Sequence, residues 1–315
     1  MQRATFVAGD WGTSRLRLFL CDAGGAVLDS IDGPGASEVR GAFPSTFDQL
    51  LSDWSRRNGA LPTVLCGMVG SSFGWAPAPY LACPALPEQI ADACVELRGP
   101  RVHIVPGLSC RNRLDAPDFM RGEETQILGA LQLQPTLRRG RHLLCLPGTH
   151  AKWAVLEDAA VREFVTAPTG ELFELLCSHS VLVSDNGIGT AISDEPAFNQ
   201  GLAQFRRFPH AGLLHRLFEC RSRRLNGELA SDASASYLSG LLVANDVGGA
   251  LQLLAPAGEM TSVQLIGDPQ LTRLYTMALA AQGLESQAMD GAAASLAGLV
   301  HVHRLLSHEV AAHGT

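Results

Sequence analysis

Two short segments combine glycine with hydroxyl side chains where one strand-like run gives way to another. The first is GDWGTS at 9–14, between the apolar run 4–8 and the alternating run 15–20, and the second is GTHAKW at 148–153. Such turns present backbone N–H groups and hydroxyls to an anion, and lysine adds a positive charge. Each alone is typical of an ordinary hairpin, but both open similar halves of the chain, which favours phosphate binding. The candidate phosphate ligands are Gly12, Thr13, Ser14, Arg15, Gly148, Thr149 and Lys152.

The familiar phosphate-binding loops are absent from this sequence. GxxxxGK[ST] cannot occur because the only lysine, Lys152, follows Ala151, and no GxGxxG follows the first strand-like run. Phosphoryl transfer at the two turns would also need Mg²⁺, held mostly through water, and a carboxylate that accepts the proton of the attacking hydroxyl.

Three acidic residues are candidates for these tasks. Asp10 is expected in the first turn beside its hydroxyls, where it either holds Mg²⁺ through water or caps the turn through its own backbone. Glu123 and Glu124 open a helix predicted over 123–133, and a helix N-terminus favours their charges. The pair therefore supplies either a catalytic carboxylate or two capping acids.

Composition excludes several classes of protein. Hydrophobic residues make up 46% of the chain and charged residues 17%, which is typical of a globular protein. The net charge of −7 lacks the positive field that nucleic acids require, and no apolar run approaches the roughly 20 residues of a membrane span. We expect neither partner, and a cytoplasmic location, since the start of the chain resembles no secretory signal. The eight cysteines fall singly, which favours reduced thiols over disulfides or zinc.

Hydrophobic patterning predicts the elements that position the candidate residues. Strands are expected at 4–8, 15–20, 26–31, 63–69, 101–105, 142–147, 152–156, 161–167 and 263–267, and helices at 45–57, at 123–133 and over most of the chain beyond Thr169. A long loop reaches Pro87, and 106–120 is expected to be irregular. Because a strand, a polar turn and a strand begin again after Gly140, we expect two α/β domains, at 1–138 and 139–315.

Five segments carry a resemblance to known proteins. GDWGTSRLRLFL (9–20) resembles the first phosphate motif of the sugar-kinase, actin and Hsp70 superfamily, GTHAKW resembles its second, and LIGDPQL (265–271) lies where its adenosine motif would be. The chain more closely resembles the 2-dehydro-3-deoxygalactonokinase family. This closer resemblance rests on GDWGTSR, CGMVGSSFGW (66–75), FMRGEETQILGAL (119–131) and LPGTHAKW (146–153).

The resemblance implies a two-domain actin-like ATPase fold of the ribonuclease H-like type, with an interdomain cleft. It implies an ATP- and Mg²⁺-dependent phosphotransferase that phosphorylates the 6-hydroxyl of 2-dehydro-3-deoxy-D-galactonate in galactonate catabolism. Residues 1–138 would bind the sugar acid and carry the first phosphate motif, and 139–315 would bind the nucleotide, with Gly267 in the adenosine motif.

The resemblance also suggests the base. In related sugar kinases an aspartate opens the helix just before the second phosphate motif, and Glu123 lies within a residue of that place. The change from Asp to Glu leaves the choice between Glu123 and Glu124 open.

The GSSFG segment at 70–74 permits a second interpretation, the nucleophile elbow of a hydrolase. An elbow must continue into a helix, yet Pro77 and Pro79 follow at once. A loop that binds a sugar acid fits better. The candidate substrate ligands are Gly67, Met68, Ser71 and Arg121, while Arg15, Arg111 and Arg113 are alternatives for the substrate carboxylate.

Two alternative functions stay open at this point. The acceptor could be another sugar acid, such as 2-dehydro-3-deoxygluconate, because epimers differ in the direction of one hydroxyl. The chain could also be a nucleotide-binding regulator that retained the fold without catalysis. The sequence does not define the oligomeric state and leaves a homodimer open.

Overall fold

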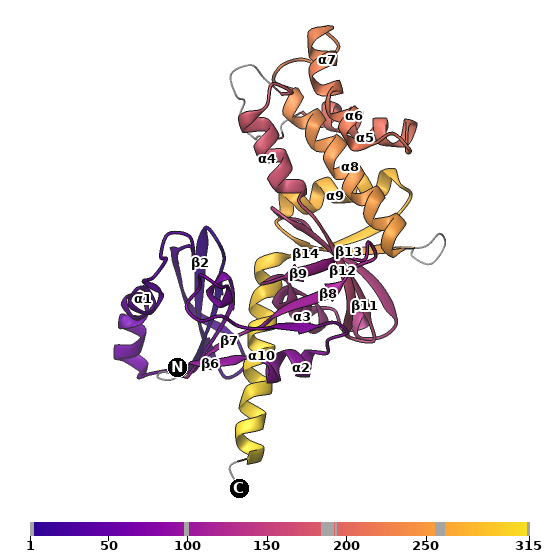
Figure 1. Ribbon diagram of the computed structural model, residues 1–315. Coiled ribbons are helices and arrows are strands. Elements are labelled where there is room, and N and C mark those ends of the chain that lie inside the picture. The colour runs from indigo at the N-terminus through magenta and orange to yellow at the C-terminus, as the bar shows by residue number, and fades with distance from the viewer. Residues whose placement is uncertain (1–2, 98–100, 184–191, 193, 256–261, 314–315) are drawn as a thin grey trace. The chain divides into compact units, whose positions relative to one another are not determined.

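The computed structural model describes residues 3–97, 101–183, 192, 194–255 and 262–313 (Figure 1). The first half contains β1 (Ala4–Trp11), β2 (Arg15–Asp22), β3 (Val27–Pro34), α1 (Phe43–Asn58), β4 (Thr63–Gly67), η1 (Met68–Gly70), β5 (Tyr80–Ala82), α2 (Pro87–Asp92), β6 (Val95–Leu97), β7 (Val102–Ile104), β8 (Gly107–Arg111), β9 (Pro117–Met120), α3 (Glu123–Leu133) and η2 (Pro135–Arg138). The second half contains β10 (Arg141–Leu146), β11 (Ala151–Glu157), β12 (Ala160–Ala167), α4 (Thr169–His179), α5 (Glu195–Arg207), α6 (Leu213–Leu217), α7 (Glu219–Leu225), α8 (Ser234–Leu254), β13 (Ser262–Gly267), α9 (Pro269–Ala281), β14 (Glu285–Asp290) and α10 (Gly291–His313).

The chain forms two compact units. The first comprises Met1–Arg141, Val155–Phe164 and Met289–Thr315, and the second comprises His142–Ala154 and Val165–Ala288. Helix α10 therefore belongs to the first unit, although it follows the whole second unit in the sequence. The expected division at 138/139 into a sugar-acid domain and a nucleotide domain stays a prediction.

A six-stranded sheet with the order β3-β2-β1-β4-β7-β6 is the centre of the first unit. The β1–β2 and β2–β3 pairs are antiparallel, whereas β4 pairs with both β1 and β7 in parallel. Leu16, Leu18 and Leu20 on β2 are buried, while the residues between them are partly exposed, as the period-two pattern predicts. The predicted antiparallel start of the chain is confirmed.

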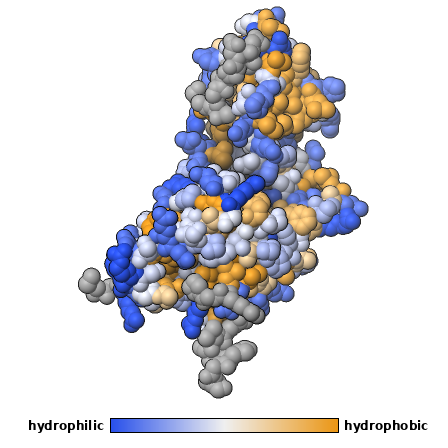
Figure 2. Space-filling model, turned by 60° about the vertical axis from the view of Figure 1, so that its left-hand side comes forward, coloured by the Kyte–Doolittle hydropathy of each residue, from blue (hydrophilic) through white to orange (hydrophobic). Residues whose placement is uncertain are grey.

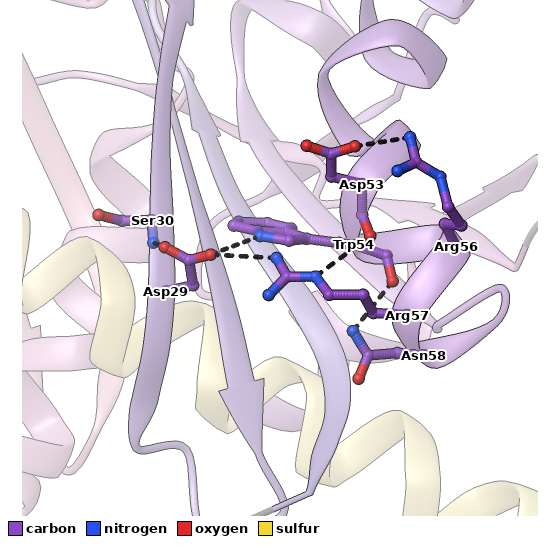
Figure 3. Close-up of polar contacts among 7 residues, drawn as sticks. All are labelled: Asp29, Ser30, Asp53, Trp54, Arg56, Arg57 and Asn58. Atoms are coloured by element: carbon purple, nitrogen blue, oxygen red, sulfur yellow. Dashed lines mark hydrogen bonds and ion pairs between the residues drawn. The ribbon is translucent and has the colours of Figure 1, made fainter.

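Helix α1 packs on this sheet through one apolar face. Phe43, Phe47, Leu51 and Trp54 recur at helical spacing and are all buried. The Trp54 indole Nε1 donates to Asp29 Oδ2 on β3 over 2.9 Å (Figure 3). This bond ties the last turn of the predicted helix to the edge of the sheet.

Helices α3 and α10 approach each other closely enough for their backbones to meet. A Cβ at Gly129 would lie 1.8 Å from the Ala294 carbonyl oxygen, and a Cβ at Gly298 would lie 2.0 Å from the Thr125 carbonyl oxygen. Only glycine fits at either position. The helix that begins with the two glutamates is therefore fixed along its length by α10.

A sheet with the order β12-β11-β10-β13-β14 lies largely in the second unit, and its strands β10 and β13 are parallel. Val155–Phe164, which covers parts of β11 and β12, is grouped with the first unit. The predicted strands at 142–147, 152–156, 161–167 and 263–267 are confirmed. Helices α4 to α9 also belong to the second unit, and α8 is buried along most of its length. Apolar residues also gather on the surface of the helical end of this unit (Figure 2), where Leu214 and Phe218 are exposed.

Segment 106–120 is not irregular, so that prediction is wrong. It forms β8 and β9, which join β5 in a three-stranded sheet of the first unit. Strands β6 and β14 and helix α2 were likewise not predicted. Most of these elements span only three to six residues, too few for a periodic pattern to register.

Candidate active site

Asp10 lies in strand β1, one residue before its end, and not in the turn where we expected it. The strand extends to Trp11 because β2 continues the antiparallel register as far as the Trp11–Leu16 pair. Asp10 is opposite Arg17, whose Nη2 lies 2.6 Å from Asp10 Oδ2. The Asp10 side chain is 16% exposed and that of Arg17 is 29% exposed, so a partly buried ion pair anchors the carboxylate.

The first phosphate turn comprises Gly12, Thr13 and Ser14, and a neighbouring segment braces it. The Ser37 N–H and hydroxyl both donate to the Thr13 carbonyl oxygen, over 3.0 and 2.8 Å. Gly35 packs so closely that a Cβ there would lie 2.3 Å from the Ser14 carbonyl carbon. Thr13 and Ser14 are exposed, so a fixed backbone presents their hydroxyls to solvent.

Arg15 follows this turn but is already paired. Its Nη2 lies 2.8 Å from Asp32 Oδ2 across the β2–β3 pair, and both side chains are exposed. The hydrogen bond and charge of Asp32 raise the pKa of Arg15. A phosphate would therefore compete with Asp32 for this guanidinium.

Gly67 brings the end of β4 next to Asp10. Its φ is +88°, and a Cβ there would lie 2.7 Å from the Trp11 carbonyl oxygen and 3.6 Å from Asp10 Oδ1. Met68 begins η1 directly after Gly67 and is partly buried. The sequence motif CGMVGSS thus passes directly beside the predicted metal-binding carboxylate.

The N-terminus of α3 joins the same place. A Cβ at Gly122, where φ is +105°, would lie 3.6 Å from Gly67 Cα. The Arg121 N–H donates to Glu123 Oε2 over 2.9 Å, and the Gly122 N–H donates to Glu124 Oε2 over 2.7 Å. The structure thus brings Asp10, Gly67 and the two glutamates together, although they are far apart in sequence.

Burial distinguishes the two glutamates. Glu124 is fully buried, and Thr125 Oγ1 donates to its Oε1 over 3.0 Å, whereas Glu123 is only partly buried. Burial, followed by the negative charge of Glu123, raises the pKa of Glu124 to about 8. A base must reach the proton that it accepts, so the geometry favours Glu123.

Cys66 lies beside Asp10 and was not singled out from the sequence. It pairs with Asp10 in the parallel β1–β4 register and is fully buried. Burial raises the pKa of its thiol, and the charges of Asp10 and Glu124 raise it further. The thiol therefore stays neutral.

One guanidinium nitrogen of Arg121 has no hydrogen-bond partner among the described residues. Its Nη2 donates to the Ala78 carbonyl oxygen over 2.8 Å, and the guanidinium lies over the Tyr80 ring at 4.3 Å from the centroid. Its Nη1 and the hydroxyl oxygen of Ser71 are buried without a hydrogen-bond partner among the described residues. A Cβ at Gly70, next to Ser71, would lie 2.7 Å from this Nη1, so these two polar groups belong to one small region.

The alternative arginines differ from Arg121 in this respect. Arg111 Nη1 lies 3.1 Å from Asp115 Oδ1, and Arg113 Nη2 lies 2.5 Å from Glu163 Oε1. Buried polar groups in native proteins are normally hydrogen-bonded, so these two groups can still bind a ligand or a water molecule. The structure thus favours Arg121 and Ser71 as the site for an anionic substrate group.

The second phosphate turn lies between β10 and β11 and rests on the N-terminus of α4. A Cβ at Gly170 would lie 2.4 Å from the Gly148 carbonyl oxygen, and the Glu171 N–H donates to the Thr149 carbonyl oxygen over 2.9 Å. His150 Nε2 lies 2.8 Å from Glu171 Oε2. The turn is therefore held on one side, while Thr149 stays exposed.

Lys152 lies in β11 beyond this turn. Its side chain is 5% exposed, and its Nζ donates to Thr166 Oγ1 on β12 over 2.8 Å. The predicted contact of Lys152 with the transferring phosphoryl group stays a prediction.

A pocket of about 810 Å³ opens beside the second turn. Its wall includes Gly148 from the turn, Thr169 from α4, and Asp268 and Tyr275 from the segment that follows Gly267. Asp268 caps α9 by accepting from the Gln270 N–H over 2.8 Å. This volume falls in the range of about 300–1,000 Å³ that small-molecule sites occupy. Sequence reasoning missed Thr169 and Tyr275, because no motif distinguishes them.

The described residues contain no group of three or more His, Cys, Asp or Glu side chains arranged to hold a metal. The eight cysteines are free thiols. In the same part of the chain, no helix combines the length and the apolar character needed to cross a bilayer.

Comparison with known proteins first defines the class. The fold is that of the actin-like ATPases, with two units that each carry a sheet and helices. The structure matches an activator of 2-hydroxyisocaproyl-CoA dehydratase from Clostridium difficile, solved with bound ADPNP, with a TM-score of 0.52, 10% identity and 97% of each chain covered. The expected fold class is confirmed.

The family follows from closer matches. The chain belongs to the 2-keto-3-deoxy-galactonokinase family, whose model matches residues 10–302. It is 33% identical to the 2-dehydro-3-deoxygalactonokinase of Escherichia coli K12, covering 98% of this chain and 99% of that protein. It is 38% identical to a probable 2-dehydro-3-deoxygalactonokinase of Rhizobium meliloti, covering 93% and 95%.

A solved structure supports the same family. A crystal structure from Sinorhizobium meliloti, of a protein assigned as a 2-dehydro-3-deoxygalactonokinase, superimposes with a TM-score of 0.86 and 36% identity. The match covers 96% of this chain and 99% of that one. The resemblance inferred from the sequence motifs is confirmed.

Proposed function

We propose that this protein transfers the γ-phosphoryl group of ATP to the 6-hydroxyl of 2-dehydro-3-deoxy-D-galactonate. The products are 2-dehydro-3-deoxy-D-galactonate 6-phosphate and ADP. Identity of 33–38% with 2-dehydro-3-deoxygalactonokinases over at least 93% of the chain is the observation that carries this proposal.

The second unit supplies the nucleotide site in this proposal. Its pocket is bounded both by Gly148 of the phosphate turn and by the start of α9 after Gly267. ATP would place its phosphates at the N–H groups of Gly148 and Thr149 and its nucleoside toward α9. In the first unit, the exposed hydroxyls of Thr13 and Ser14 stay predicted phosphate ligands.

The first unit supplies the acceptor and the base. Glu123 accepts the proton of the 6-hydroxyl as that oxygen attacks the γ-phosphorus and the bond to the leaving ADP oxygen breaks. The carboxylate of the sugar acid binds Arg121 Nη1 and Ser71 Oγ, the two unsatisfied polar groups. Gly67 and Met68 are the remaining proposed substrate ligands, because Gly67 lies beside Asp10 and Met68 begins the turn that leads to Ser71.

Mg²⁺ fits the residues that are present only if water supplies most of its ligands. Asp10 offers one carboxylate, and Arg17 already occupies its Oδ2. Since Mg²⁺ keeps several waters and commonly takes one or two carboxylates plus substrate phosphates, a single aspartate is sufficient. Bound there, the ion would neutralise charge on the phosphates during transfer.

Three further expectations accompany this proposal. Other sugar acids, such as the gluconate epimer, are alternative acceptors, and a regulator without catalysis is the alternative function. The partners would be the sugar acid and ATP, with a homodimer left open. The expected cytoplasmic location stays a prediction.

Mg²⁺-dependent ADP release tests the proposal directly. Four reactions are compared, with 2-dehydro-3-deoxygalactonate, its gluconate epimer, a plain hexose and no acceptor. ADP release that depends on the galactonate acid supports the proposed reaction. Preference for another acceptor would keep the kinase activity and assign that acceptor as the substrate. ATP binding without release for any acceptor would favour the regulator.

A further inference from the structure

A buried carboxylate outside the predicted motifs connects four elements of the second unit. Asp246 on α8 is 8% exposed and accepts hydrogen bonds from three side chains. Trp153 Nε1 on β11 and Thr169 Oγ1 on α4 each donate over 2.8 Å, and the Tyr275 hydroxyl on α9 also donates. One aspartate thus joins α8 to a strand and to two other helices.

Two of these bonds lead to the second phosphate turn. Trp153 closes the GTHAKW motif, in the strand that leaves the turn. Thr169 begins α4, and the next residue, Gly170, packs against the Gly148 carbonyl oxygen at a distance that no side chain could tolerate. A shift of Thr169 would therefore move the surface on which the turn rests.

The third bond leads to another residue of the pocket wall. Tyr275 lies one and a half turns into α9, which starts at the predicted adenosine motif. Thr169 and Tyr275 both line the pocket. Asp246 therefore holds two wall residues that come from separate helices.

Burial of the charged Asp246 carboxylate costs free energy, which its hydrogen bonds must offset. Burial raises the pKa of Asp246, which shows that the charged form is penalised there, while its three hydrogen bonds act in the opposite direction. No basic residue is among the three partners. Fully satisfied buried polar groups of this kind rigidify the elements that they join.

We propose that Asp246 is a positioning residue for the nucleotide: it fixes the spacing between the second phosphate turn and α9, and so preorganises the pocket before ATP binds. This inference rests on the proposed function, because it takes the 810 Å³ pocket as the nucleotide site. Asp246 itself acts through Thr169, Trp153 and Tyr275.

Asp246→Asn tests the proposal with little change in side-chain volume. Asparagine has one carbonyl oxygen in place of two carboxylate oxygens, so it cannot accept all three bonds. We expect ADP and ATP to bind about tenfold more weakly by calorimetry, with a matching rise in the KM for ATP. The KM for the sugar acid should change less than about twofold, since its proposed ligands lie in the other unit.

Tyr237→Phe is the matched control. Tyr237 is buried on the same helix, and its hydroxyl donates to Glu219 Oε2 over 2.9 Å, but it is not among the residues that line the pocket. This variant also loses one buried hydrogen bond of α8 and should keep the wild-type affinity for ADP. Equal weakening in both variants would show a general effect of a loosened α8 and would overturn the proposal.

A coupling measurement distinguishes positioning from direct contact. Tyr275→Phe should weaken ADP binding in the wild type but change it much less in the Asp246→Asn background. Additive effects would overturn the proposal. If Asp246→Asn does not fold, the pair Tyr275→Phe and Thr169→Val is compared instead, and full ADP affinity in both would overturn it.

The failure of the proposed function has a different signature. Wild-type protein that binds neither ADP nor ATP would refute the nucleotide site itself. Wild-type binding that persists unchanged in Asp246→Asn would refute only the role of Asp246.

Discussion

Glu123 and Glu124 share the first turn of α3, yet only Glu124 is completely enclosed. The Gly122 N–H and the Thr125 hydroxyl both donate to Glu124, and its pKa is raised to about 8, so it carries a proton at neutral pH. Glu123 is partly buried and accepts from the Arg121 N–H. The two adjacent carboxylates thus have different environments because their solvent access differs.

Glu123→Gln should therefore nearly abolish phosphoryl transfer, with kcat lower by about 100-fold or more, because the amide cannot accept a proton. Glu124→Gln should cost much less, since glutamine resembles the protonated acid that burial already favours. Steady-state kinetics of the two variants check this. A larger loss for Glu124→Gln would reassign the base.

The raised pKa of Glu124 also predicts how stability depends on pH. The ordinary pKa of this side chain is 4.5, and its pKa in the folded protein is about 8. Between these two pH values, Glu124 is ionised only in the unfolded chain. The stability that Glu124 contributes is complete below pH 4.5 and is lost as the pH rises toward 8. Across this window the free energy of unfolding of wild type should fall relative to that of Glu124→Gln. Parallel pH curves for the two proteins would contradict the assignment.

Arg121→Met and Ser71→Ala should each raise the KM for the sugar acid, because each removes one unsatisfied polar group. For Arg121→Met the KM for the sugar acid should rise about tenfold or more, because a charge-assisted hydrogen bond to the substrate carboxylate is lost. The KM for ATP should not change. Arg111→Met, which breaks an exposed pair with Asp115, is the control and should behave as wild type.

Trp54→Phe should destabilise the fold without affecting catalysis, because it removes the donor to Asp29 shown in Figure 3. The Trp54 bond is the main cause that lowers the pKa of Asp29, followed by the Ser30 N–H. Asp29 is well exposed, so the hydrogen bond itself should contribute about 1 kcal/mol or less, and the smaller buried ring adds a packing loss to this. Its lowered pKa means that this contribution exists near neutral pH and disappears as Asp29 is protonated in acid. Denaturant unfolding should therefore show a larger difference between variant and wild type at pH 7 than at pH 3, where only the lost packing of the buried indole remains.

Gly129→Ala should be strongly destabilising, by about 3 kcal/mol or more, because its Cβ would overlap the Ala294 carbonyl oxygen. Gly249→Ala on α8 is a matched control, since a Cβ there meets nothing within 4 Å. That change should stabilise the helix by roughly 0.5–1 kcal/mol. Thermal unfolding of both variants measures the contrast, and equal melting temperatures would show that α3 and α10 can separate at little cost.

The sequence predicted those features that depend on local pattern. The hairpin around GDWGTS, the helix over 123–133 and the strand over 263–267 all appear where periodicity and turn residues indicated. Asp10 was displaced from turn to strand because the pairing with Arg17 continues the ladder, and pairing is a tertiary property.

Other features required the assembled structure. Glu123 and Glu124 are adjacent residues of the same type, so their sequence gives no reason for different burial. The difference depends on the tertiary packing around the start of α3. Asp246 has no motif around it, and its importance appears only when Trp153, Thr169 and Tyr275 converge on it from distant segments. The strands of the β5-β8-β9 sheet were too short to leave a periodic signal.

The contact of α3 with α10 has a consequence for how the protein is made. The whole second unit is synthesised between these two helices, so Gly129 must wait for Ala294 and Gly298 to emerge before its helix gains its closest partner. Contacts of such long sequence separation form late and slowly. On the ribosome, the helix that carries Glu123 should therefore be among the last parts of the chain to acquire native protection, after the second unit has already folded.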